Sequence, residues 1–78
     1  MTIKEYLKVT NFETIDDVEI DVWRKDADGK DTPLNLKSLT IKEMMKNKLK
    51  DFEIKSVDVY LSGCGSWGGF IRLDINVK

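Results

Sequence analysis

The residues of this chain whose types and spacing could support chemistry begin with a glycine-rich segment. Gly63-Cys64-Gly65-Ser66-Trp67-Gly68 matches the pattern G-x-G-x-x-G, which in other proteins binds phosphate groups through backbone amides. The dinucleotide-binding form of this motif requires a helix directly after the glycines, whereas the sequence here predicts a strand. We therefore expect residues 62–69 to form the tip of a hairpin, and the sequence leaves open whether this loop binds anything.

Cys64 lies within that segment and is the only cysteine of the chain. A catalytic cysteine needs a neighbouring base to form the thiolate, and the chain contains no histidine to serve as one. A single cysteine also excludes an intrachain disulfide, as expected of a protein in the reducing cytoplasm. We expect a cytoplasmic protein without enzymatic activity and without a cofactor.

Three carboxylates around Gly29, those of Asp26, Asp28 and Asp31, suggest a calcium-binding loop. Aligning Gly29 with the invariant glycine of an EF-hand places Arg24 at the first ligand position and Asn35 at the last, where Asp and Glu are required. The sequence therefore predicts an Asp-Gly turn between two strands, and no metal site.

The charge of the chain is nearly balanced, with 13 Lys and Arg against 14 Asp and Glu and a net charge of −1. This balance argues against the extended positive field of a strongly basic nucleic-acid-binding protein. Locally, however, residues 36–50 contain five lysines and one glutamate. Lys42, Lys46 and Lys50 are spaced four apart, so on one helix they would form a basic face. An interface for nucleic acid on this face is the alternative functional hypothesis.

The elements that would position these residues fit one domain, residues 1–78, because folding units commonly comprise about 100–150 residues. No apolar run is long enough for a signal peptide or a membrane span.

Thr2 and Glu5 have the spacing of a capping box and predict a short helix at the start. The main helix is predicted to begin at Ser38 or Thr40, and Thr40 and Glu43 repeat the capping-box spacing. Its apolar stripe is formed by Ile41, Met44, Met45, Leu49 and Phe52.

Alternation of apolar and polar residues predicts strands over 18–22, 57–61 and 71–77. A weaker run over 34–36 predicts a further strand, which Pro33 restricts to a sheet edge. The alternation changes phase near Lys55-Ser56, where we expect a helix end or a β-bulge.

Two registers are open for the pairing of the last two strands. Pairing Tyr60 with Phe70 places Asp58 opposite Arg72, whereas a shift of two residues places Asp58 opposite Asp74. We favour the first register because like charges that face each other destabilise a sheet.

The elements together predict a small α+β domain of order α-β-β-α-β-β, with a mainly antiparallel sheet of three or four strands and helices packed on one face. The covered face would comprise Val18, Ile20, Val22, Val57, Val59, Ile71, Leu73 and Ile75. The opposite face would then display Trp23, Tyr60, Phe70 and Arg72 among carboxylates, with Trp67 at the hairpin tip as a fifth anchor. Aromatic residues with arginine are typical of protein-binding hot spots, although the aromatics could equally be paired across strands. Unpaired backbone at the Pro33 edge or at the terminal strand would also allow a homodimer or strand addition.

The opening Thr2-Ile3-Lys4-Glu5-Tyr6-Leu7, followed by an acidic linker and a Val-x-Ile-x-Val strand, resembles the start of small accessory proteins of phages and mobile elements of Gram-positive bacteria. The resemblance covers about the first twenty residues and carries over no functional residue. It implies a setting in which small proteins bind and inhibit host machinery, including defence nucleases. Our leading hypothesis is accordingly a non-enzymatic protein-binding module, in its most concrete form an inhibitor comparable to anti-CRISPR proteins.

Overall fold

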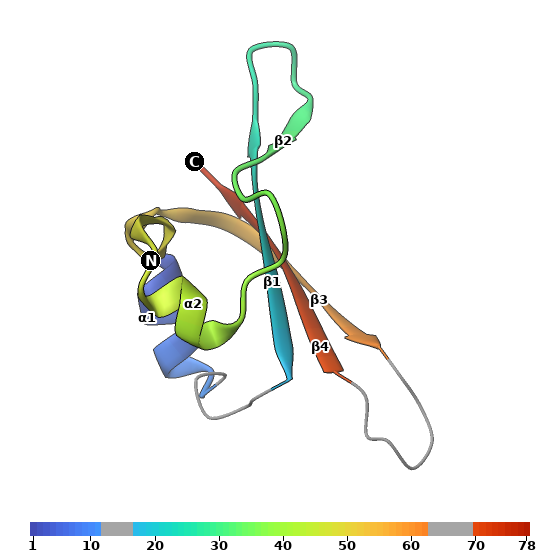
Figure 1. The fold of residues 1–78 in the computed structure, drawn as a ribbon. Coiled ribbons are helices and arrows are strands. Elements are labelled where there is room, and N and C mark those ends of the chain that lie inside the picture. Colours follow the sequence, from blue (N-terminus) through green and yellow to red (C-terminus); the bar gives the residue numbers. More distant parts are fainter. Residues whose placement is uncertain (12–16, 63–69) are drawn as a thin grey trace.

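The computed structural model describes residues 1–11, 17–62 and 70–78, with the backbone alone for residues 61, 62 and 70. Its elements, drawn in Figure 1, are helix α1 (Ile3–Val9), strands β1 (Val18–Lys25) and β2 (Asp31–Pro33), helix α2 (Ile41–Met45), the 3-10 helix η2 (Lys48–Asp51), and strands β3 (Ile54–Ser62) and β4 (Phe70–Val77). The sheet has the order β2-β1-β4-β3. Its β1–β2 and β3–β4 pairs are antiparallel, and its central β1–β4 pair is parallel. The predicted α+β class is confirmed.

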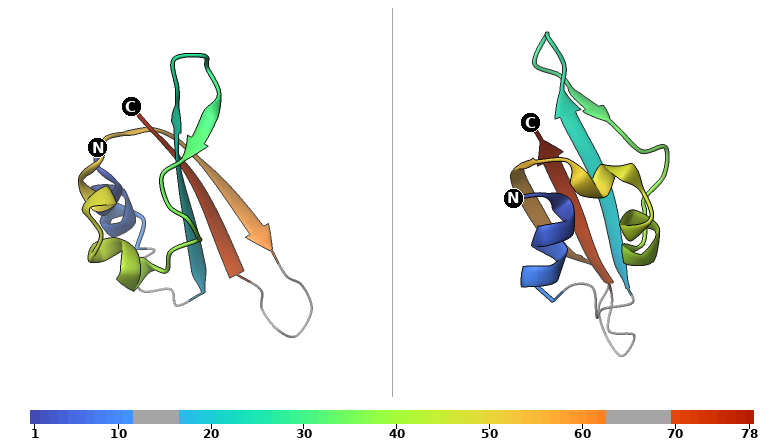
Figure 2. Two further views of the ribbon diagram at one scale, coloured as in Figure 1. Left: turned by 45° about the horizontal axis from the view of Figure 1, so that its top comes forward. Right: turned by 90° about the vertical axis from the view of Figure 1, so that its left-hand side faces the viewer.

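The helices pack on one face of the sheet, as predicted, and the core lies between the two layers (Figure 2). Every second residue of β1 and β4 points into this layer, because side chains alternate across a strand. The buried core residues come from all three helices and from the two central strands: Ile3, Leu7, Val18, Ile20, Val22, Ile41, Met44, Leu49, Leu73, Ile75 and Val77. From the edge strand β3, Val57 is partly buried. Val59 was predicted on the covered face but is 49% exposed, because it lies on the edge strand.

Both predicted capping boxes are present. The backbone N–H of Glu5 donates to Thr2 Oγ1 at 3.2 Å, and Glu5 Oε1 accepts from Thr2 N at 3.0 Å. The Thr40–Glu43 pair has the same two hydrogen bonds, at the same lengths. Each pair satisfies backbone donors of a first helical turn that have no partner within the helix.

The prediction of one long main helix is wrong, because α2 ends at Met45 after five residues. Asn47 then adopts an extended backbone conformation, and its side-chain Oδ1 accepts from Leu49 N at 3.0 Å, which starts η2. Asparagine is favoured at such caps because its short side chain can accept from the following backbone amides. The apolar stripe of the sequence is thus divided between two short helices that bury Met44 and Leu49 separately.

The predicted strand over 34–36 is also wrong. Strand β2 ends at Pro33, and Leu36 is fully exposed. The side chain of Asn35 takes over the pairing with β1: its Oδ1 accepts from Val22 N at 2.9 Å and its Nδ2 donates to Ile20 O at 3.2 Å. Residues 34–38 therefore form a loop outside the sheet.

The predicted Asp-Gly turn is confirmed, since Gly29 has φ 81° and Asp26 Oδ1 accepts from the backbone of Asp28 and Lys30.

The register that we favoured for the last two strands is wrong, because Tyr60 pairs with Arg72 and Asp58 with Asp74. A shift of two residues keeps every side chain on the same face, so the apolar alternation does not distinguish the two registers. The predicted bulge is confirmed by the register shift between Ile54 and Ser56.

The sheet order confirms the expected edge at Pro33, which belongs to the edge strand β2, and corrects the other expected edge. The terminal strand β4 lies in the centre, and the exposed long edge is β3. In the part of the chain that the structure describes, no helix is both long enough and apolar enough to cross a membrane.

Candidate functional site

The candidate site is the face of the sheet that the helices leave uncovered, here called the open face. Strand register arranges nine of its residues in three rows that cross β1, β4 and β3. The rows are Trp23–Asn76–Ser56, Asp21–Asp74–Asp58 and Glu19–Arg72–Tyr60. The alternation that buries the intervening apolar residues places all nine on this face.

The middle row of the open face consists of carboxylates. Arg72 lies beside it, and its Nε is 3.4 Å from both Asp21 Oδ2 and Asp74 Oδ1. One cation on β4 therefore offsets the repulsion between the carboxylates of Asp21 on β1 and Asp74 on β4. Asp58 forms no ion pair with any of the described residues. With Glu19 included, the nine residues of the three rows comprise four carboxylates and one arginine, so this part of the open face is acidic.

The predicted aromatic anchors are only partly brought together. Tyr60 is directly paired with Arg72, and it is 51% exposed. Trp23 is partly buried and occupies the diagonally opposite corner of the three rows, with the acidic row between it and Tyr60. Trp67 and the side chain of Phe70 lie outside the described residues. The two described aromatics thus flank an acidic centre instead of forming one continuous apolar patch.

A hollow of about 490 Å³ adjoins the acidic row, between the open face and the loop 34–38. Its walls include Asp21, Trp23 and Arg72 from the sheet. Ser38 belongs to the loop, and its hydroxyl donates to Asp21 Oδ1 at 2.9 Å. Together with the Asn35 hydrogen bonds to β1, this contact holds the loop beside the face. The sequence analysis did not predict the roles of Asn35 and Ser38. The one sequence signal for the role of Asn35 is its position two residues after a proline that ends a strand.

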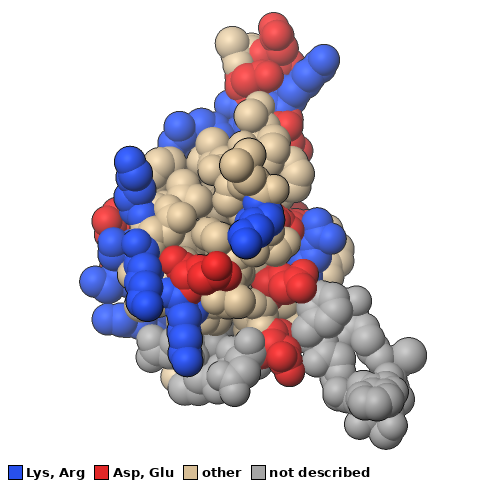
Figure 3. Space-filling view, viewed as in Figure 1, with Lys and Arg blue, Asp and Glu red and all other residues tan. Residues whose placement is uncertain are grey.

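The lysines of the alternative hypothesis do not share one helix. Lys42 lies in α2, Lys46 caps its end, and Lys50 lies in η2, where its Nζ is 3.6 Å from Asp51 Oδ2. The four-residue spacing therefore does not produce a basic helix face. Lysine and arginine nevertheless gather on the side of the molecule where the helices lie (Figure 3). That side is away from the acidic open face.

Within the described residues, no group of three or more cysteine or carboxylate side chains is placed to hold a metal ion. The glycine-rich segment, including Cys64, lies outside the described residues. Comparison with known protein families, curated proteins and solved structures gives no match.

Proposed function

We propose that this protein is a non-enzymatic binding module that uses the open face to occupy the surface of a protein partner. The observation that carries the proposal is an uncovered sheet face on which Tyr60, Arg72 and Trp23 surround a row of three carboxylates. Arginine and aromatic side chains are the residues most enriched at binding hot spots. The lack of histidine in the chain supports a role without catalysis.

The charge of the open face indicates what kind of partner surface it would bind. Its carboxylates would attract lysine and arginine of a partner, above all Asp58, which forms no ion pair within the described residues. Nucleic acid is disfavoured on this face because the acidic row repels phosphates. In its most specific form, we propose a cytoplasmic inhibitor of a larger host protein, comparable to anti-CRISPR proteins. It would be encoded by a phage or mobile element, and the resemblance of the first twenty residues supports that origin.

The test is affinity capture from bacterial lysate, with and without nuclease, followed by calorimetry with the captured protein. Tyr60→Ala and Trp23→Ala should each weaken binding at least about tenfold, because truncated hot-spot residues cost about 2 kcal/mol or more. Val9→Ala is the matched control, since Val9 is an exposed apolar residue on α1. Thermal unfolding of each variant separates lost contacts from lost folding.

Two outcomes would contradict the proposal. Unchanged affinity in both aromatic variants would exclude the open face as the interface. Capture that disappears with nuclease, together with loss of binding in Lys42→Ala/Lys46→Ala, would assign the function to nucleic acid on the helical side. In that case the affinity would also fall steeply with salt, because each neutralised phosphate releases counterions.

A further inference from the structure

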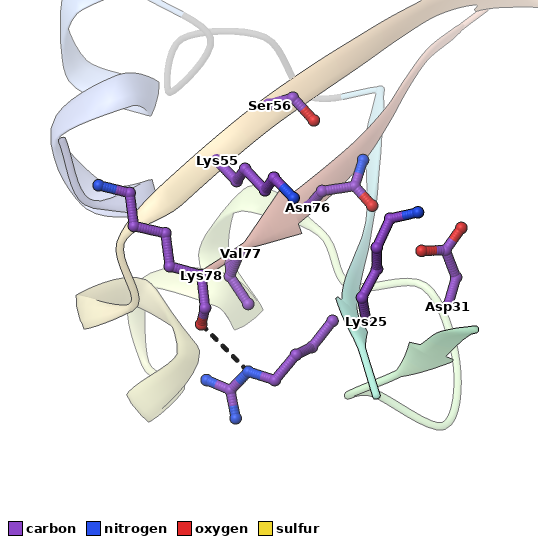
Figure 4. A pocket seen from close by; sticks show the side chains of 8 residues that line it. Lys25, Asp31, Lys55, Ser56, Asn76, Val77 and Lys78 are labelled. Atoms are coloured by element: carbon purple, nitrogen blue, oxygen red, sulfur yellow. Dashed lines mark hydrogen bonds between the residues drawn. The ribbon is translucent and has the colours of Figure 1, made fainter. Parts of the chain in front are cut away.

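A second hollow of about 490 Å³ lies at the end of the sheet where β1 and β4 finish and β3 begins (Figure 4). Four of the side chains that line it are cationic and one is a carboxylate, so the lining side chains carry a net charge of +3. These residues are Arg24, Lys25, Lys55, Lys78 and Asp31. The charge of this hollow is opposite to that of the acidic row. Neither the open-face proposal nor the lysines of the helical side explain this cluster of positive charge.

The fold brings these cations together from three strands. Lys55 is the extra residue of the β-bulge, so both Lys55 and Ser56 lie beside Asn76 of β4. Lys25 is the last residue of β1, one position beyond the pairing of Arg24 with Val77. In Figure 4 the ammonium groups of Lys25 and Lys55 lie on either side of the Asn76 side chain. Two charges from distant parts of the sequence therefore face one small volume.

The one carboxylate that lines the hollow belongs to Asp31, which is paired with Lys25 across β1 and β2. Among the ion pairs of the described residues, none involves Lys25 or Lys55. Arg24, by contrast, is held in place. Its Nε donates to the main-chain oxygen of Lys78 at 3.2 Å, and its guanidinium lies 5.1 Å from the centroid of the Phe52 ring. Of the four cations, Lys25 and Lys55 therefore direct their ammonium groups to the Asn76 end of the hollow, whereas the Arg24 guanidinium is turned toward Phe52 and the Lys78 main chain.

We propose that this hollow is an anion site for a small molecule that carries a diphosphate or triphosphate group. Two ammonium groups on either side of Asn76 suit a polyphosphate better than a single carboxylate, because a polyphosphate offers several charges and many acceptor oxygens to lysine. The hydroxyl of Ser56 and the amide of Asn76 provide neutral donors in the same wall. The volume lies within the usual range for small-molecule sites. The adjoining Asp58–Asp74 pair repels phosphate, which confines the anion to the outer end of the sheet.

The test is a titration of the full chain with sodium pyrophosphate, followed by ¹H–¹⁵N NMR at constant, low ionic strength. We expect saturable shifts of the amides of residues 24–25, 55–56 and 76–78. Lys25→Gln/Lys55→Gln should raise the dissociation constant about tenfold, because it removes two charge-assisted contacts. Lys42→Gln/Lys46→Gln removes the same charge from the helical side, and it should leave the constant within about twofold.

Parallel titrations with inorganic phosphate and with citrate distinguish the class of anion. Weaker binding of both than of pyrophosphate would support a polyphosphate ligand, and equal binding of citrate would overturn that assignment. Shifts that do not saturate, or an equal loss in the two double variants, would show general attraction to lysines and would overturn the site. If Lys25→Gln/Lys55→Gln alters the amide shifts of the core, the single variant Lys55→Glu replaces it, and unchanged pyrophosphate affinity there would contradict the proposal.

Discussion

At the scale of single residues, the two capping boxes connect local sequence to the pH dependence of stability. The backbone N–H and then the hydroxyl of Thr2 hold the pKa of Glu5 below its ordinary value of 4.5, and Thr40 lowers the pKa of Glu43 in the same way. A carboxylate whose pKa is lowered by folding stabilises the native state above its unfolded pKa. That contribution is lost as the pH falls from about 4.5 through the lowered pKa.

The corresponding prediction compares two glutamate variants by chemical denaturation between pH 3 and pH 7. In Glu43→Gln, the loss of stability on acidification should be smaller than in the natural protein, because glutamine keeps the capping hydrogen bond but does not titrate. Glu19→Gln is the control, since Glu19 is exposed on the open face and caps no helix. An identical pH dependence in Glu43→Gln and the natural protein would contradict this account.

At the scale of elements, the helical layer depends on tertiary contacts more than on its own length. Helices as short as α1, α2 and η2 are not stable alone in water, because ordering the first turn loses more conformational entropy than its few hydrogen bonds offset. Each is held by a few core side chains: Ile3 and Leu7 in α1, Ile41 and Met44 in α2, and Leu49 in η2. The strands supply the complementary surface.

Met44→Ala should therefore lower the free energy of unfolding by about 2–5 kcal/mol, as for other fully buried large-to-small changes. That is a large part of the roughly 5–15 kcal/mol that stabilises a typical domain. Lys42→Ala, an exposed position in the same helix, should change it by no more than about 0.5 kcal/mol. Urea denaturation monitored by circular dichroism measures both values, and similar small losses would show that α2 does not anchor the core.

At the scale of the whole molecule, the strand order leaves β3 as a nine-residue edge with apolar side chains exposed on both sides. Val59 is 49% exposed toward the helical side, and Tyr60 is 51% exposed on the open face. Long edges with exposed apolar residues favour pairing with another strand. We therefore expect two copies of the chain to associate through β3 at high concentration.

Sedimentation velocity over a concentration series checks this expectation. Val59→Lys should shift the distribution toward the monomer, because a charge on an edge strand opposes pairing. Val9→Lys introduces the same charge at an exposed apolar position of α1 and should have no such effect. A monomer at every concentration would show that the β3 edge is protected.

The sequence alone determined those features whose interactions are local. Thr2 with Glu5 and Thr40 with Glu43 marked both helix starts correctly, because a capping box is complete within four residues. Alternation of apolar residues likewise identified β1 and β4 and the face that each buries. The open face and its acidic residues followed from the same alternation.

Only the tertiary structure decided how these pieces are combined. The register of Asp58 with Asp74, the central place of β4 and the end of α2 at Met45 all differ from the sequence prediction. The central place of β4 depends on its parallel pairing with β1, and the end of α2 depends on the cap that Asn47 provides to η2. The candidate site was predicted as a face, but its acidic centre between separated aromatics came from the register. A shift of a strand by two residues leaves the same apolar side chains on the same face. The alternation of apolar residues therefore cannot distinguish the two registers, and contacts between strands distant in the sequence select one of them.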